Sequence, residues 1–122
     1  MMSLADGQLE LYSGNDDQVL PILSLGGLGV ISVLSNVAPK FTHDMVMKYF
    51  DGDTKGATED QLKALPLINA LFSEVNPIPV KTAMNLMGMN VGPLRMPLCE
   101  MEEGTKAALA KEIEKFGLKL AK

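Results

Sequence analysis

The first third of the chain alternates between short apolar runs and polar turns in the order strand, helix, strand. Residues 9–12 (Leu-Glu-Leu-Tyr) form a short candidate strand, and the turn cluster Ser13-Gly14-Asn15-Asp16 follows it. An apolar helical run extends from Val19 to Leu25 and ends at Gly26-Gly27. Residues 29–34 are almost continuously apolar, which is typical of a strand buried on both faces of a parallel sheet. A helix that joins two parallel strands makes a βαβ unit.

After this strand–helix–strand unit, the pattern of apolar residues predicts only helices, joined by loops. Thr42 is expected to cap a first helix that Gly52 ends, and its apolar face holds Met45, Val46, Tyr49 and Phe50. After the polar loop 51–56, a longer helix is expected from about Thr58. Its buried face is predicted to hold Leu62, Leu65, Ile68, Leu71 and Phe72. Pro66 lies inside this helix and should kink or break it.

Two further helices are predicted in the last third of the chain. Residues 76–79 (Asn-Pro-Ile-Pro) are expected to be extended, because proline disfavours helix at the residue before it. The helix that follows has an apolar stripe of Val80, Ala83, Met84 and Met87 and ends at Gly88. A loop at 91–98 leads to a final helix of about 102–116, which buries Leu109, Ile113 and Phe116 and stops at Gly117. Two parallel strands leave unpaired edges, so the chain has the pattern of a piece of a larger α/β fold.

Composition narrows the class of protein. The 122 residues are enough for one ordinary domain, and the net charge of −4, with no basic stripe, argues against nucleic acid or an anionic membrane as partner. The single cysteine, Cys99, excludes an internal disulfide. No window approaches the roughly 20 apolar residues of a membrane span, and the N-terminus does not have the pattern of a signal peptide. A soluble cytoplasmic protein is expected, with no membrane partner, metal site or cofactor.

Polar residues follow both predicted strands, at the ends where parallel α/β folds place their functional sites. The cluster 13–16 follows the first strand, and Ser35-Asn36 follows the second. If the strands are parallel neighbours, these patches lie side by side on one rim and their polar groups can line a small-molecule pocket. The alternative is turn and cap chemistry, with Asn15 or Asp16 capping the next helix. Spacing alone leaves both interpretations open.

Other candidate groups form no recognisable catalytic or metal-binding set. The loop 51–56 begins like a calcium loop, but Lys55 occupies a ligand position and Leu62 stands where a bidentate glutamate belongs. His43, the only histidine, is expected at the surface near a helix start. Cys99 has no basic cluster near it in the sequence and is expected to be packed and unreactive.

No lysine has the position that covalent chemistry would need. An imine-forming enzyme uses a lysine that projects from a buried strand end, and neither predicted strand contains a basic residue. Lys81 is expected to pack its stem along a helix with its charge in water. Glu74 and Glu100 are isolated carboxylates in the sequence.

Four stretches together resemble the C-terminal part of the dihydrodipicolinate synthase family, the Schiff-base aldolases of the N-acetylneuraminate lyase superfamily. They are Tyr-Ser-Gly-Asn-Asp at 12–16, Leu-Gly-Gly-Leu-Gly-Val-Ile-Ser-Val at 25–33, Glu-Val-Asn-Pro-Ile-Pro-Val-Lys at 74–81 and Gly-Pro-Leu-Arg-Met-Pro-Leu at 92–98. Their order and spacing agree with the family over essentially the whole chain. The resemblance implies that residues 1–55 are the last two strand–helix units of a TIM (β/α)8 barrel. Residues 9–13 would be the seventh strand, 29–34 the eighth, and 56–122 a C-terminal helical extension, so that this chain alone is mostly helical.

The resemblance also implies an activity. In that family, pyruvate forms an imine with a lysine of the sixth strand and condenses with aspartate semialdehyde on the route to diaminopimelate and lysine. That lysine would lie upstream of Met1, so no catalytic residue is expected in this chain and the chain alone is expected to be inactive. Ile31 matches an eighth-strand isoleucine whose backbone lies against pyruvate, and Gly14 matches a seventh-strand glycine that lines the same pocket. Ser13 and Asn36 are expected at the pocket rim.

Several interpretations stay open at this point. The chain is either a segment without independent activity or a structural segment that complements an N-terminal barrel partner or copies of itself. A related pyruvate-dependent aldolase of the N-acetylneuraminate lyase type is the alternative activity. An unrelated small-ligand module built on the turn 13–16 is a third possibility. Full-length family members often form tetramers, and strands without neighbours expose apolar surface, so a homo-oligomer or association with the missing barrel segment is expected.

Overall fold

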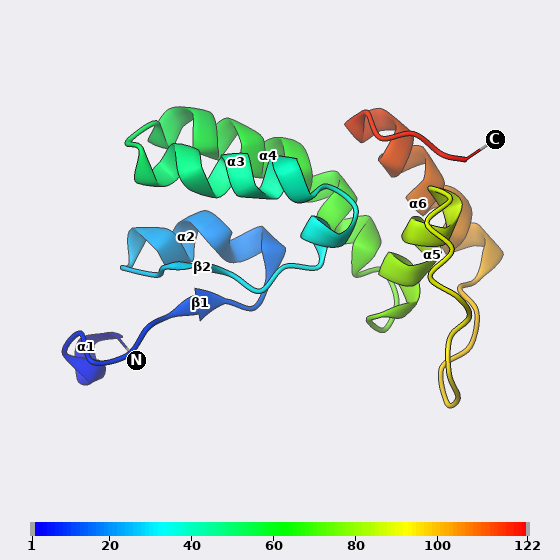
Figure 1. Ribbon diagram of the computed structural model, residues 1–122, viewed down its shortest axis with the longest axis horizontal. Helices are drawn as coiled ribbons and strands as arrows, with labels where there is room; N and C mark the ends of the chain where they lie inside the picture. Colours follow the sequence, from blue (N-terminus) through cyan, green and yellow to red (C-terminus); the bar gives the residue numbers. More distant parts are fainter. Residues whose placement is uncertain (1, 122) are drawn as a thin grey trace.

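The computed structural model describes residues 2–121, which form a two-stranded parallel sheet and a larger set of helices (Figure 1). The strands are β1 (Tyr12–Ser13) and β2 (Gly29–Val30). The helices are α1 (Met2–Ala5), α2 (Val19–Ser24), α3 (Pro39–Phe50), α4 (Thr54–Leu71), α5 (Ile78–Leu86) and α6 (Glu103–Phe116), with short 3-10 helices η1 (Asp16–Gln18) and η2 (Leu34–Asn36).

The predicted strand–helix–strand unit is present, but both strands are shorter than the sequence pattern indicates. β1 pairs in parallel with β2, with Tyr12 opposite Gly29 and Ser13 opposite Val30. The apolar run 29–34 leaves the sheet after Val30 and turns into η2, so the six-residue strand is wrong. Ile31, which directly follows β2, is 73% exposed. Within the described residues, the run 29–34 is therefore not buried on both faces.

The predicted helix after β2 begins earlier than expected. α3 starts at Pro39, whose fixed backbone angle suits a first helical position. Thr42 is not the cap, because it lies inside the helix and its hydroxyl donates to the Ala38 carbonyl at 3.0 Å. The helix ends at Phe50, close to the predicted stop at Gly52.

The long helix α4 differs from its prediction in start, continuity and buried face. It begins at Thr54, because the Asp53 side chain accepts a hydrogen bond from the Gly56 amide at 2.9 Å and caps it. It continues through Pro66 as a single helix. Gln61 is buried, whereas Leu62, predicted to be in the core, is 60% exposed.

The last two helices agree more closely with the sequence pattern. α5 begins at Ile78, so the expected extended entry is wrong at Ile78 and Pro79, because proline is tolerated within the first helical turn. α6 spans Glu103–Phe116 as predicted, and Gly117 ends it in a left-handed conformation with φ of 100°. Leu109 and Ile113 are fully buried, and Phe116 is half-buried.

Most of the buried apolar side chains lie away from the strand pair. The larger cluster joins η2, α4, α5 and α6, with Leu34, Leu67, Leu71, Leu109 and Ile113 among its fully buried members. A smaller cluster lies between α2, α3 and the start of α4, and it includes Val19, Leu20 and Met45. In Figure 1, the strand pair lies beneath α2, while α5 and α6 gather at the opposite end of α4. None of the described helices is long and apolar enough to cross a membrane.

Candidate functional site

Gly14 and Ile31 come together at the carboxyl end of the strand pair. Each immediately follows one of the paired residues, Ser13 and Val30. The Ile31 amide donates to the Ser13 carbonyl at 2.8 Å, which extends the parallel ladder by one hydrogen bond. Gly14 is exposed, and no atom lies within 4 Å of the position a Cβ would take. These two residues therefore form an open ledge of backbone and one exposed aliphatic side chain.

The polar side chains predicted at this rim are engaged in local turns. Ser13 is buried, and its hydroxyl donates to the Asn15 carbonyl at 2.7 Å. The Asn36 side-chain amide donates to the Val33 carbonyl at 3.0 Å. The Ser35 amide donates to the Ser32 hydroxyl at 2.8 Å. These hydroxyl and amide groups therefore stabilise turns, as the second interpretation expects. The exposed residues at this rim are Gly14 and Ile31.

Asp16 has a role that the sequence pattern did not indicate. Its side chain is buried and does not cap η1 or α2, the two helices directly after it, in contrast to the expected capping by Asn15 or Asp16. One carboxylate oxygen accepts from the Ser32 hydroxyl at 2.5 Å, and the other accepts from the amides of Val33 and Leu34 at 2.9 and 3.0 Å. These hydrogen bonds hold residues 32–34, where the chain leaves β2 and enters η2. The only sequence signal was an aspartate in a turn, and its partners lie 16 to 18 residues away.

A cavity of about 310 Å³ opens between β2 and α3. Its lining is largely apolar and includes Tyr12, Val30, Val46 and Met47. His43 lies at this cavity with an exposed side chain, as predicted for a surface histidine. Among residues 2–121, no group of three His, Cys, Asp or Glu side chains is arranged to hold a metal ion.

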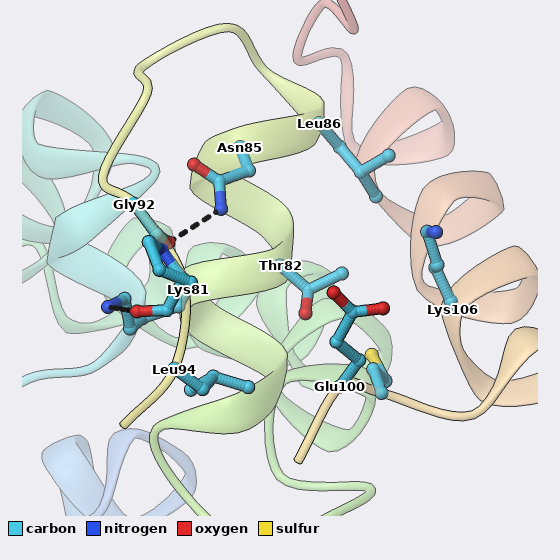
Figure 2. Close-up of a pocket in the computed structure, with 10 residues that line it drawn as sticks. Lys81, Thr82, Asn85, Leu86, Gly92, Leu94, Glu100 and Lys106 are labelled. Atoms are coloured by element: carbon cyan, nitrogen blue, oxygen red, sulfur yellow. Dashed lines mark hydrogen bonds between the residues drawn. The ribbon is translucent and has the colours of Figure 1, made fainter. Parts of the chain in front are cut away.

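A second cavity, of about 290 Å³, lies beside α5 and is bordered by the loop 88–101 and α6 (Figure 2). Lys81 donates from Nζ to the Pro93 carbonyl at 2.7 Å. Asn85 donates to the Gly92 carbonyl at 3.1 Å and accepts from the Val91 amide at 2.9 Å. The ammonium of Lys81 therefore contacts the loop at an exposed position. The sequence pattern indicated the exposed charge but not this contact. Figure 2 shows Glu100 and Lys106 on the other side of α5 from Lys81 and Asn85.

Two further residues differ from their predicted surroundings. Glu74 is not isolated: its carboxylate accepts from the Glu102 amide at 3.1 Å and from the Thr105 hydroxyl, so it caps the start of α6. Cys99 is exposed rather than packed. The sequence pattern could not show the Glu74 contacts, because they join residues 28 and 31 positions apart.

The parallel strand pair, its connecting helix and the ledge at its carboxyl end define part of an α/β protein of the parallel-sheet class. Residues 1–116 match the model of the dihydrodipicolinate synthetase family. The chain belongs to this family. The match is consistent with a C-terminal portion of its members, as the four sequence stretches indicated.

Individual relatives give the same result. The chain is 63% identical over 113 residues to the 4-hydroxy-tetrahydrodipicolinate synthase of Lachnoclostridium phytofermentans, covering 93% of this chain and 38% of that protein. It is 56% identical over 118 residues to the enzyme of that name from Clostridium tetani, covering 97% and 40%.

Solved structures extend the similarity to the fold. The dihydrodipicolinate synthase of Thermotoga maritima superimposes with a TM-score of 0.91 at 44% identity, covering 96% of this chain and 40% of that chain. The chain thus spans about 40% of the length of the relatives it matches. These neighbours are TIM-barrel enzymes, and the part present here is mostly helical.

Proposed function

We propose that this chain forms the last two strand–helix units and the helical extension of a barrel of the dihydrodipicolinate synthase type. In this proposal β1 and β2 belong to strands seven and eight, residues 1–55 to the barrel, and residues 56–122 to the extension. The observation that carries it is the parallel pair β1–β2, joined by α2, in a chain that covers about 40% of a synthase at a TM-score of 0.91. Open edges on this pair fit a sheet that continues on both sides.

The ledge at the carboxyl end of the pair would be one wall of a pyruvate pocket. Active sites of such barrels lie at the carboxyl ends of the strands, which is where Gly14 and Ile31 meet. Gly14 lets a ligand approach the backbone closely, because it has no side chain. Ser13 and Asn36 contribute less, since turn hydrogen bonds occupy their side chains. The full reaction would be condensation of pyruvate with aspartate semialdehyde through a lysine imine, in the cytoplasm.

The lysine nucleophile would lie outside this chain. None of the lysines among residues 2–121 lies on β1 or β2, and the ammonium of Lys81 is bound to a carbonyl. We expect that borohydride treatment of the chain with pyruvate traps no adduct, measured by mass spectrometry of the intact chain. The full-length L. phytofermentans relative serves as the positive control. A stoichiometric adduct on any lysine of this chain would refute the proposal that it has no nucleophile.

Association with the other part of a barrel follows from the exposed apolar surface. Leu9, Leu28 and Ile31 are each more than 45% exposed around the strand pair, and apolar surface of this kind marks an interface. We expect that mixing the chain with a segment carrying the first six strands of the L. phytofermentans relative restores condensation. If both segments stay soluble and no product forms from pyruvate and aspartate semialdehyde, the proposal of a complementing segment fails. Product from another aldehyde alone would favour a related aldolase.

A further inference from the structure

The exit of β2 is held by a buried carboxylate that is distant from it in the sequence. Asp16 is 2% exposed, and within the described part of the chain its carboxylate contacts neutral donors only: one hydroxyl and two backbone amides. Burying a carboxylate is costly unless hydrogen bonds replace the lost water. The three bonds meet that need, and they fix the residues that directly follow Ile31.

A second buried side chain ties Asp16 to the helical extension. Gln61 on α4 is 6% exposed, and its Nε2 donates to the Asp16 carbonyl at 2.8 Å across 45 positions of sequence. Its Oε1 accepts from the Leu20 amide at 3.4 Å, at the second residue of α2. Both ends of the Gln61 amide therefore hold backbone in the segment from η1 to the first turn of α2. Every buried side-chain nitrogen and oxygen in the described chain has at least one hydrogen-bond partner, and this holds for the atoms of this network.

We infer that Asp16 and Gln61 are positioning residues for the Gly14–Ile31 ledge, through which the helical extension fixes the wall of the pocket. Asp16 holds the segment after Ile31 by its carboxylate, and Gln61 holds Asp16 by its carbonyl. Neither residue belongs to the ledge itself. This inference rests on the proposed function, in which the ledge contacts pyruvate, and it adds a reason why α4 affects binding at a site that it does not line.

The geometry is tested in the chain as it exists, by hydrogen exchange of single amides followed by NMR. In Asp16→Ala, exchange at Val33 and Leu34 should rise by about tenfold or more, because both amides lose their acceptor. In Asp16→Asn, exchange should stay near wild type, since the amide oxygen can accept from both and the NH₂ can donate to Ser32. Asp17→Ala, at the exposed neighbour, is the matched control. Unchanged exchange at both amides in Asp16→Ala overturns the inference.

Gln61→Met gives a second variant of similar volume, which decides the matter where Asp16→Ala does not fold. It should increase exchange at the Leu20 amide, while Glu59→Gln on the exposed face of α4 should not. An unchanged Leu20 amide in Gln61→Met contradicts the role of the extension.

Kinetics of the reconstituted barrel separate positioning from simple loss of fold. Gln61→Met should raise KM for pyruvate by about tenfold with a smaller change in kcat, because both hydrogen bonds of the Gln61 amide to the backbone at Asp16 and Leu20 are lost. A variant that only lowers the amount of folded assembly would lower the apparent kcat at constant KM. Unchanged KM in an active assembly overturns the inference. A wild-type assembly without activity instead refutes the proposed function, and the exchange data still decide the geometry.

Discussion

Leu109→Ala tests whether the helical core, rather than the strand pair, holds this chain together. Leu109 is fully buried in the larger cluster, on α6 where it packs against α4. The substitution removes three carbon atoms. At about 0.8 kcal/mol for each buried methylene, the transfer cost alone is about 2.4 kcal/mol. The cavity that remains adds to this, so we expect a loss of about 3–4 kcal/mol in the free energy of unfolding.

Urea denaturation followed by circular dichroism measures this loss. With a slope of about 1–3 kcal/mol per molar urea, the midpoint should fall by about 1–4 M at an unchanged slope. Leu62→Ala is a matched control, because the same atoms are removed from a side chain that is 60% exposed. We expect it to cost less than about 1 kcal/mol. Equal midpoint shifts for the two variants would refute the assignment of the buried face of α4 and its packing on α6.

Three further outcomes are expected. Glu74→Ala should lower the free energy of unfolding by about 1 kcal/mol, because α6 loses its cap, while Glu100→Ala should have little effect; equal losses in urea contradict this. The Lys48 Nζ lies 2.6 Å from the Asp60 Oδ2, and this hydrogen bond raises the pKa of the lysine above its usual value of 10.5. Because the folded-state pKa is the higher one, the stabilisation is complete below pH 10.5 and is lost as pH rises through the folded-state value. The stability difference between wild type and Asp60→Asn should therefore shrink above that pH, and a pH-independent difference would count against the pair. Cys99 should react with a thiol reagent without urea, and labelling only on unfolding would show that it is packed.

The agreement between sequence and structure is best where the signals are local. α6 runs between an acidic start and Gly117, as its pattern predicts, because capping and left-handed glycine act within one turn. The order strand–helix–strand is also confirmed, because short apolar runs separated by turn residues are local signals. The Gly14–Ile31 ledge was found from the resemblance and the position of polar residues after each strand. Its role in pyruvate binding stays a prediction.

The differences have a common cause in contacts between distant residues. The strand 29–34 ends at Val30 because Asp16 takes the amides of Val33 and Leu34. In α4, Gln61 is buried and the neighbouring Leu62 is exposed. Both ends of the Gln61 amide bond to backbone at Asp16 and Leu20, contacts that the apolar periodicity of the helix does not record.

The sequence by itself determined the family, the number and order of the longer helices, and the parallel strand pair. These depend on apolar periodicity, glycine and proline positions, and motifs that occupy adjacent residues. Only the tertiary structure decided where β2 ends, which face of α4 is buried, and which groups satisfy Asp16 and Glu74. Those outcomes depend on hydrogen bonds between residues 16 to 45 positions apart. A buried polar group must find a partner wherever folding brings one, and no local pattern records which partner that is.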